Sequence, residues 1–119
     1  MGAALAGFLG VALGAFAAHG LKNTIPPPML ATFETGVRYQ MYHAFALFAA
    51  AWGLARWQGR AFVLAAWLFV AGIVVFSGSL YLLALTGARW LGVVTPLGGL
   101  AFLAGWLCLA WAAATKMRE

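Results

Sequence analysis

Long apolar runs alternate with short polar connections along this chain. Apolar residues dominate the stretches 2–19, 37–56, 61–86 and 91–114. Each stretch falls near or within the roughly 17–25 residues that a helix needs to cross a bilayer. No positively charged segment precedes the first stretch, which favours a retained span over a cleaved signal peptide. The pattern predicts an all-α protein, an antiparallel, up-and-down bundle of four transmembrane helices that forms one membrane domain over residues 1–119.

The second apolar stretch is the most polar of the four. Its clean apolar part covers only 44–55, whereas a spanning helix needs about 20 residues. A helix that ends near Arg56 must therefore include polar residues from Arg38 to His43. Ionisable groups at such depth are costly and are usually paired. Glu34 precedes Arg38 by four residues, a spacing that allows an ion pair on one helix face.

Turn residues suggest where the first helix ends and the second begins. Gly20 suits a left-handed cap after the first helix, and Pro28 can open the next helix because its missing N–H is not needed there. Small residues recur within the helices and would allow close helix approach. In the first helix they share one face, and in the last helix they lie near its start: Gly7, Gly10, Gly14 and Ala18, then Gly98 and Gly99.

With four spans, the polar side chains of different helices converge at the end of the bundle away from the termini. This distribution predicts a polar cluster between the helices, beneath one face of the bilayer. It is the candidate site, with these members: His19, Glu34, Arg38, Tyr39, Gln40, His43, Ser77, Ser79, Tyr81 and Thr95.

Composition supports a membrane location. Hydrophobic residues make up 66% of the chain and charged residues 8%, against about 25% charged in a soluble domain. The net charge of +5 does not indicate nucleic-acid binding, because the basic residues are dispersed around the apolar stretches. Four lie on the side of the termini, and three lie on the other side, where Glu34 would neutralise Arg38. This bias favours both termini in the cytoplasm of a bacterial inner membrane.

Four stretches also resemble a known family. They are residues 14–22, 33–43, 76–81 and 95–99, with the sequences GAFAAHGLK, FETGVRYQMYH, FSGSLY and TPLGG. These stretches closely resemble the domain-of-unknown-function 423 family, whose eukaryotic relatives are called transmembrane protein 256. The resemblance covers essentially the whole chain and implies a small, multi-pass, four-helix membrane protein. The family has no established activity, so the resemblance carries over no catalytic or binding role.

Three functional hypotheses follow. The first is a structural or interaction protein that contacts membrane lipid and forms a homo-oligomer or a subunit of a larger membrane complex. The second is a component that binds or transports a lipid, small molecule or ion through the polar cluster. The third is a haem or metal protein that uses His19 and His43, although two histidines without nearby Cys or acid ligands are a weak metal signal. The sequence has no Asp, nucleophile elbow or phosphate loop, so we expect no catalytic site and no cofactor.

Overall fold

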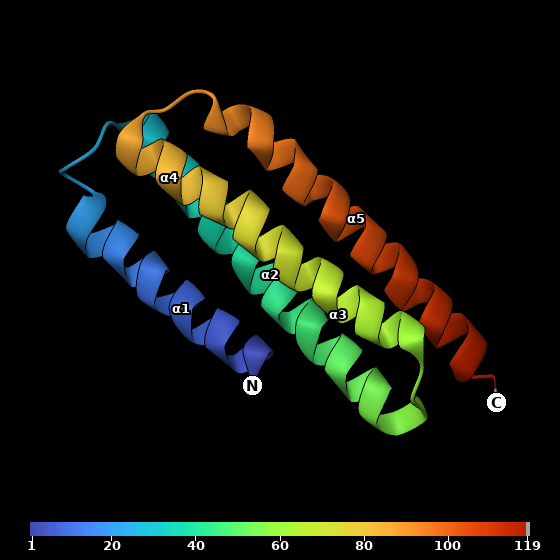
Figure 1. The fold of residues 1–119 in the computed structure, drawn as a ribbon. Coiled ribbons are helices and arrows are strands. Elements are labelled where there is room, and N and C mark those ends of the chain that lie inside the picture. Colours follow the sequence, from blue (N-terminus) through green and yellow to red (C-terminus); the bar gives the residue numbers. More distant parts are fainter. Residues whose placement is uncertain (119) are drawn as a thin grey trace.

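The computed structural model describes residues 1–118, and within that range the chain forms four helical rods that run alternately up and down (Figure 1). The rods are α1 (Gly2–Phe16) extended by the π-helical turn η1 (Ala17–Leu21); α2 (Pro27–Trp57); α3 (Arg60–Gly72), the π-helical turn η2 (Ile73–Ser77) and α4 (Gly78–Thr86) in one continuous rod; and α5 (Leu91–Lys116). The N-terminus and the end of α5 lie at the same end of the bundle. The predicted all-α, up-and-down architecture is confirmed.

Three of the rods are long and apolar enough to cross a membrane: Gly2–Leu21, Arg60–Thr86 and Leu91–Lys116. The fourth, α2, has 31 residues and measures about 46 Å at the rise of an α-helix. It begins ten residues before the predicted span, because Pro27 and Pro28 occupy its first two positions, where the missing proline N–H groups need no partner. This longer helix places Gln40 and His43 close to its middle instead of near one end.

The predicted left-handed cap at Gly20 is wrong. Gly20 lies inside the π-helical turn η1, which continues the first rod to Leu21. The hydroxyl of Thr24 donates to the Gly20 carbonyl at 2.6 Å, which satisfies an acceptor that the helix end leaves free. The left-handed glycine is Gly87 instead, where φ is 71° at the end of α4.

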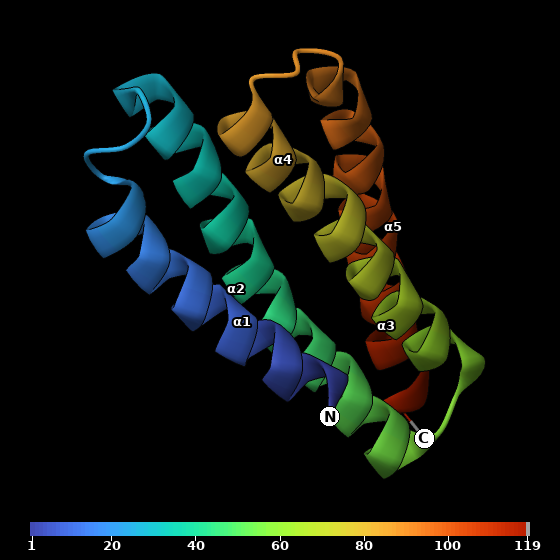
Figure 2. The same ribbon diagram turned by 60° about the vertical axis from the view of Figure 1, so that its left-hand side comes forward.

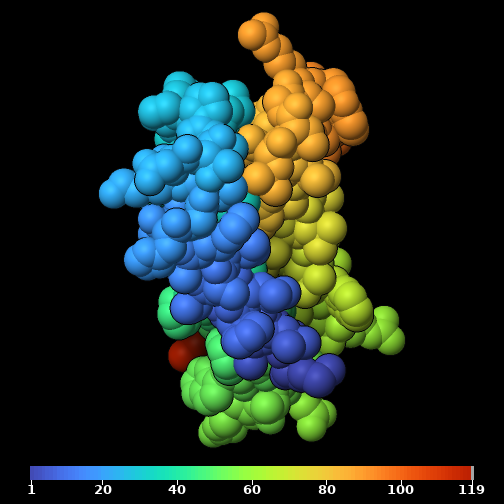
Figure 3. Space-filling model, turned by 90° about the vertical axis from the view of Figure 1, so that its left-hand side faces the viewer, coloured from blue at the N-terminus to red at the C-terminus, as the bar shows by residue number. Residues whose placement is uncertain are grey.

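The rods form an open row. Among the described residues, α1 packs mainly against α2, and η1 at its end also shares a core cluster with Ala84 of α4. Helix α2 packs mainly against the rod α3–η2–α4, and that rod shares an extensive interface with α5. Figure 2 shows α1 and α5 on opposite sides of the molecule, and the Cα extents of 53 × 26 × 16 Å reflect this flat arrangement. In Figure 3, α1 lies diagonally across one face, with α3 and α4 beside it. The edge rods α1 and α5 therefore leave much of their surface uncovered by protein.

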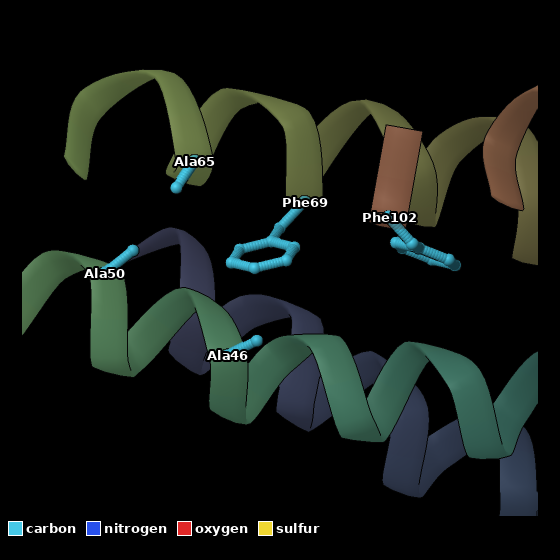
Figure 4. Packing of buried hydrophobic residues seen from close by; sticks show 5 residues of the cluster. All are labelled: Ala46, Ala50, Ala65, Phe69 and Phe102. Atoms are coloured by element: carbon cyan, nitrogen blue, oxygen red, sulfur yellow. The ribbon is translucent and has the colours of Figure 1, made fainter. Parts of the chain in front are cut away.

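Phenylalanine rings and glycines interlock where α3 meets α5. Phe69 of α3 lies against Gly105, and Phe102 of α5 lies against Gly72, so each helix inserts a ring where the other has no side chain. Both rings are buried, and they point towards α2, where Ala46 belongs to the same core cluster (Figure 4). The absence of a Cβ lets the helices approach closely enough to pack without an aqueous driving force.

The predicted small-residue faces are found only in part. A Cβ at Gly10 would overlap Met41, and one at Gly14 would meet Val37 at 3.3 Å, so α1 does approach α2 there. Gly7 has nothing within 4 Å of its Cβ position, and Ala18 is exposed. The buried seam of α1 follows a seven-residue spacing instead, which matches a contact line with a single neighbouring helix. Its buried members are Ala3, Gly10 and Ala17.

In α5 one of the two adjacent glycines lies against a neighbouring helix and the other does not. A Cβ at Gly98 would overlap the backbone nitrogen and Cβ of Phe76 in η2, whereas one at Gly99 would come no closer than 4.0 Å to the Phe76 ring. Only Gly98 is therefore needed for the contact between α5 and η2. Close contacts also occur at glycines that the sequence analysis did not identify: Gly36, Gly53, Gly72 and Gly105.

We predict that Gly98→Ala destabilises the protein while Gly99→Ala does not. The new methyl group at residue 98 meets backbone atoms that cannot move aside, and such overpacking costs about 1–3 kcal/mol. Alanine at residue 99 has room and favours the helix by up to about 1 kcal/mol over glycine. The midpoint of thermal unfolding in detergent, followed by circular dichroism, checks this. Equal midpoints for the two variants would contradict the contact between α5 and η2.

Candidate functional site

The buried polar side chains divide into four hydrogen-bonded groups that link neighbouring rods or turns. Within residues 1–118, every buried side-chain nitrogen or oxygen has a hydrogen-bond partner. A hydrocarbon environment requires this pairing, because no water is present to replace a missing partner.

Gln40 joins three rods. Its Nε2 donates to the Ala6 carbonyl of α1 at 2.8 Å, and its Oε1 accepts from the Tyr81 hydroxyl of α4 at 2.6 Å. The side chain is 4% exposed, and its reach to the α1 backbone depends on the close approach at Gly10, where a Cβ would overlap Met41. Gln40 is therefore the polar connection that holds the edge rod α1 to the rest of the bundle.

Ser77, the last residue of η2, bonds to the backbone of α2. Its hydroxyl donates to the Gly36 carbonyl at 2.7 Å, and the side chain is fully buried. Glycine at residue 36 allows the two rods to approach this closely, because a Cβ there would lie 2.7 Å from the Tyr81 ring and 3.3 Å from the Ser77 carbonyl oxygen. In the π-helical turn, the Gly78 N–H reaches the Ile73 carbonyl five residues back. Such turns are frequent at functional sites, and here the turn ends at a serine that links two rods.

Ser79 and Thr95 form the link between α4 and α5. Their hydroxyl oxygens lie 2.6 Å apart, and the Ser79 hydroxyl also lies 2.8 Å from the Phe76 carbonyl. The Thr95 hydroxyl also lies 3.2 Å from the Leu91 carbonyl, so its single hydrogen is shared between Ser79 and that carbonyl. Both hydroxyls therefore have partners near the η2 turn.

His43 is the most enclosed titratable side chain of the predicted cluster. Its Nδ1 lies 2.7 Å from the Tyr39 carbonyl, which can only accept, so Nδ1 carries a hydrogen. Its Nε2 accepts from the Trp106 indole N–H at 3.1 Å, which requires the neutral imidazole. The ring stacks on Phe102 with centroids 3.5 Å apart and an interplanar angle of 9°. These contacts hold one tautomer in one orientation.

Trp106 and Phe102 complete this group and were not among the predicted site residues. A tryptophan in the middle of an apolar stretch, away from either membrane edge, was the available signal for Trp106. No sequence signal distinguishes Phe102 from other core phenylalanines. Both residues come from α5, so their contact with α2 depends on how the rods are arranged.

Three predicted members lie outside these groups: His19, Glu34 and Arg38 are exposed. The Arg38 guanidinium donates to Thr35 Oγ1 at 3.1 Å, and among residues 1–118 it forms no ion pair with Glu34. The predicted neutralisation of Arg38 is therefore not found, because both side chains leave the helix on its uncovered surface. There each can reach solvent or lipid headgroups.

The two histidines are far apart. His19 lies in η1, whose Ala17 packs in one core cluster with Phe33 of α2. His43 is ten residues further along α2, about 15 Å at the helical rise. Both nitrogens of His43 already have partners, and within the part of the chain that the structure describes no three His, Cys, Asp or Glu side chains gather as metal ligands. The arrangement gives no support to a two-histidine haem or metal site.

The predicted gathering of polar side chains at one end of the bundle is found only in part. The Ser79–Thr95 link lies towards the end with the α4–α5 turn, as expected, but Gln40 and His43 lie beside Tyr42, the central residue of α2. The reason is the early start of α2 at Pro27. The polar groups thus extend from the middle of the bundle towards one end.

Known proteins similar to this chain are membrane proteins. The family described as "Protein of unknown function (DUF423)" matches residues 13–99. The UPF0382 membrane protein YwdK of Bacillus subtilis is 49% identical and aligns over 92% of this chain and 90% of its own length. The UPF0382 inner membrane protein YgdD of Escherichia coli is 43% identical, with 87% and 79% covered. No solved structure shows a significant match. The family match covers well over half of the chain, including all of α2 and of the rod α3–η2–α4, and this chain therefore belongs to the DUF423 family of membrane proteins.

Proposed function

We propose that this protein is a structural or interaction component of a bacterial membrane and not an enzyme. One observation carries the proposal: each buried polar side chain of the described residues is already bonded within the chain. A group that acts on a substrate or conducts an ion needs a free donor, acceptor or charge that faces a ligand. The polar residues here stabilise the contacts between rods, which leaves the outer surface for function.

The open row of rods supports an interaction role. Helix α1 packs mainly against α2, and it exposes Phe8 by 70% and Val11 by 65%. On the opposite edge, α5 exposes Leu107 by 73%. The uncovered faces of these edge rods can pack against helices of another protein without any change in the fold. We therefore place partner contacts, with a second copy or with other subunits, on α1 and α5.

The polar cluster itself gives less support to ligand or ion transport. Its bonds run mainly between rods and turns, and the groups of Gln40 and Ser77 meet at Tyr81. Arg38 and Glu34, which carry formal charge, lie on the exposed surface. A transport role would need those charges to face a passage between rods.

We place this protein in the inner membrane with both termini in the cytoplasm. The E. coli relative is named an inner membrane protein. Basic residues number four at the end with the termini (Arg56, Arg60, Lys116 and Arg118) and three at the other end (Lys22, Arg38 and Arg89). The excess of positive charge favours the cytoplasm for the first end.

The orientation predicts the behaviour of fusion proteins. Green fluorescent protein attached to the C-terminus should fluoresce, and alkaline phosphatase attached there should be inactive, because the C-terminus stays in the cytoplasm. Alkaline phosphatase inserted at the exposed Gly87 between α4 and α5 should be active and serves as the matched control. The reverse pattern of activities would contradict the proposed orientation.

The structural role of Gln40 predicts a loss of stability in Gln40→Leu. The variant removes the bond to Ala6 and leaves the Tyr81 hydroxyl without its acceptor. Bonds between membrane helices contribute about 0.6 kcal/mol each and up to about 1.7, so we expect a loss of roughly 1–3 kcal/mol, measured as thermal unfolding in detergent. Glu34→Gln is the control, because Glu34 is exposed and bonded to no neighbouring helix. A Gln40→Leu variant as stable as the native protein would contradict this role.

The proposed partner contacts predict cross-links from the edge rods. A photoreactive phenylalanine analogue at residue 8 or 107 should give discrete protein adducts when cells are irradiated. The same purified variants, irradiated in protein-free lipid vesicles, identify adducts between two copies of this chain. If both positions gave adducts only with lipid in cells, the interaction role would lose its basis.

A further inference from the structure

A lateral groove of about 750 Å³ lies between α2 and α5. It forms because both helices pack on the rod α3–η2–α4, while their direct contact is made by the side chains of His43, Phe102 and Trp106. Six aromatic side chains line it: Tyr39, Tyr42, His43, Phe76, Phe102 and Trp106. Its volume falls within the range of about 300–1,000 Å³ that is typical of small-molecule sites.

Gly99 keeps one side of the groove open. It lines the groove and has no side chain, and a Cβ there would still be 4.0 Å from the Phe76 ring. Across from it, Tyr39 packs on Phe76 with ring centroids 4.8 Å apart, and His43 stacks on Phe102. The groove is thus lined largely by flat rings, which favour an aromatic or quinoid ring in offset or edge contact.

Two hydrogen-bond donors in this groove have no partner. The nitrogens of His43 are bonded to the Tyr39 carbonyl and to Trp106. The hydroxyls of Tyr39 and Tyr42, by contrast, bond to nothing in the described chain. The two rings are neighbours, with centroids 5.6 Å apart, and Tyr42 is the central residue of α2. A phenol hydroxyl in hydrocarbon gains from any acceptor that reaches it.

We propose that this groove binds a membrane-soluble ring compound with carbonyl oxygens, of the isoprenoid quinone class. Its carbonyl oxygens accept from the hydroxyls of Tyr39 and Tyr42, its flat ring contacts the aromatic lining, and its apolar tail follows the apolar surface of α5. The proposal goes beyond the interaction role above and does not depend on it.

Other occupants satisfy the groove less well. An acyl chain has no acceptor for the tyrosine hydroxyls, and the ester carbonyls of a phospholipid, which lie at the edge of the roughly 30 Å hydrocarbon core, carry no flat ring that would fit the aromatic lining. A helix of a second protein carries backbone carbonyls that are already bonded within the helix. A carbonyl compound dissolved in the hydrocarbon core can bring a free acceptor to this groove.

The test uses the purified, full-length protein in lipid nanodiscs and decylubiquinone as the probe. Saturable binding should raise the midpoint of thermal unfolding and quench tryptophan fluorescence. Gly99→Phe fills the groove and should abolish both responses. Gly92→Phe is the matched control, because residue 92 lies on the same helix in open space and does not line the groove.

A second variant keeps the test decisive if Gly99→Phe does not fold. Tyr42→Phe removes one exposed oxygen atom and should weaken decylubiquinone binding about 3- to 20-fold, the range expected for one membrane hydrogen bond. Decylbenzene, a ring with a tail and no carbonyl, should compete poorly. The proposal is overturned if no saturable response occurs, if Tyr42→Phe binds as the native protein does, or if decylbenzene competes as well as the quinone. The adducts predicted for residues 8 and 107 test the interaction role separately.

Discussion

Hydrocarbon supplies no hydrogen-bond partner, and the packing of this protein depends on that constraint. Each buried polar side chain in residues 1–118 is bonded within the chain, and several of the bonds run to a backbone carbonyl of another rod or turn. Gln40 reaches Ala6 and Ser77 reaches Gly36. Such bonds require the helix backbones to approach closely, so the polar contacts and the glycine contacts depend on one another. Where Gly10 or Gly36 lacks a Cβ, a polar side chain can cross to the next rod.

Ring and glycine contacts determine which rods are neighbours. Phe69 against Gly105 and Phe102 against Gly72 hold α5 to α3 on one side, and Gln40 holds α1 to α2 on the other. Because α1 and α5 make these contacts on opposite sides of the molecule, the rods form an open row. The row leaves edge rods for partner contacts and a lateral groove between α2 and α5. Both proposals for function follow from this openness.

Part of the candidate site could be read from the sequence. Gln40, His43, Ser77, Ser79, Tyr81 and Thr95 were expected to lie between helices, because polar side chains in apolar stretches are costly unless paired. Their actual partners could not be predicted, since Ala6, Gly36 and Trp106 lie 34–63 residues away in the chain. The expected pair of Glu34 and Arg38 rested on helical spacing alone. Spacing permits such a contact but does not favour it on an exposed face.

The sequence by itself determined the number of rods, their alternating direction and the membrane as their solvent. Length and hydrophobicity are local properties, and the bilayer requires about 20 apolar residues for each crossing. Only the tertiary structure decided which glycine of a pair meets a neighbour, as Gly98 and Gly99 show. It also placed Trp106 on His43, and Tyr39 and Tyr42 along a groove, with hydroxyls that bond to nothing in the described chain. These features depend on the rotation and depth of each helix relative to its neighbours, and no single helix encodes those quantities.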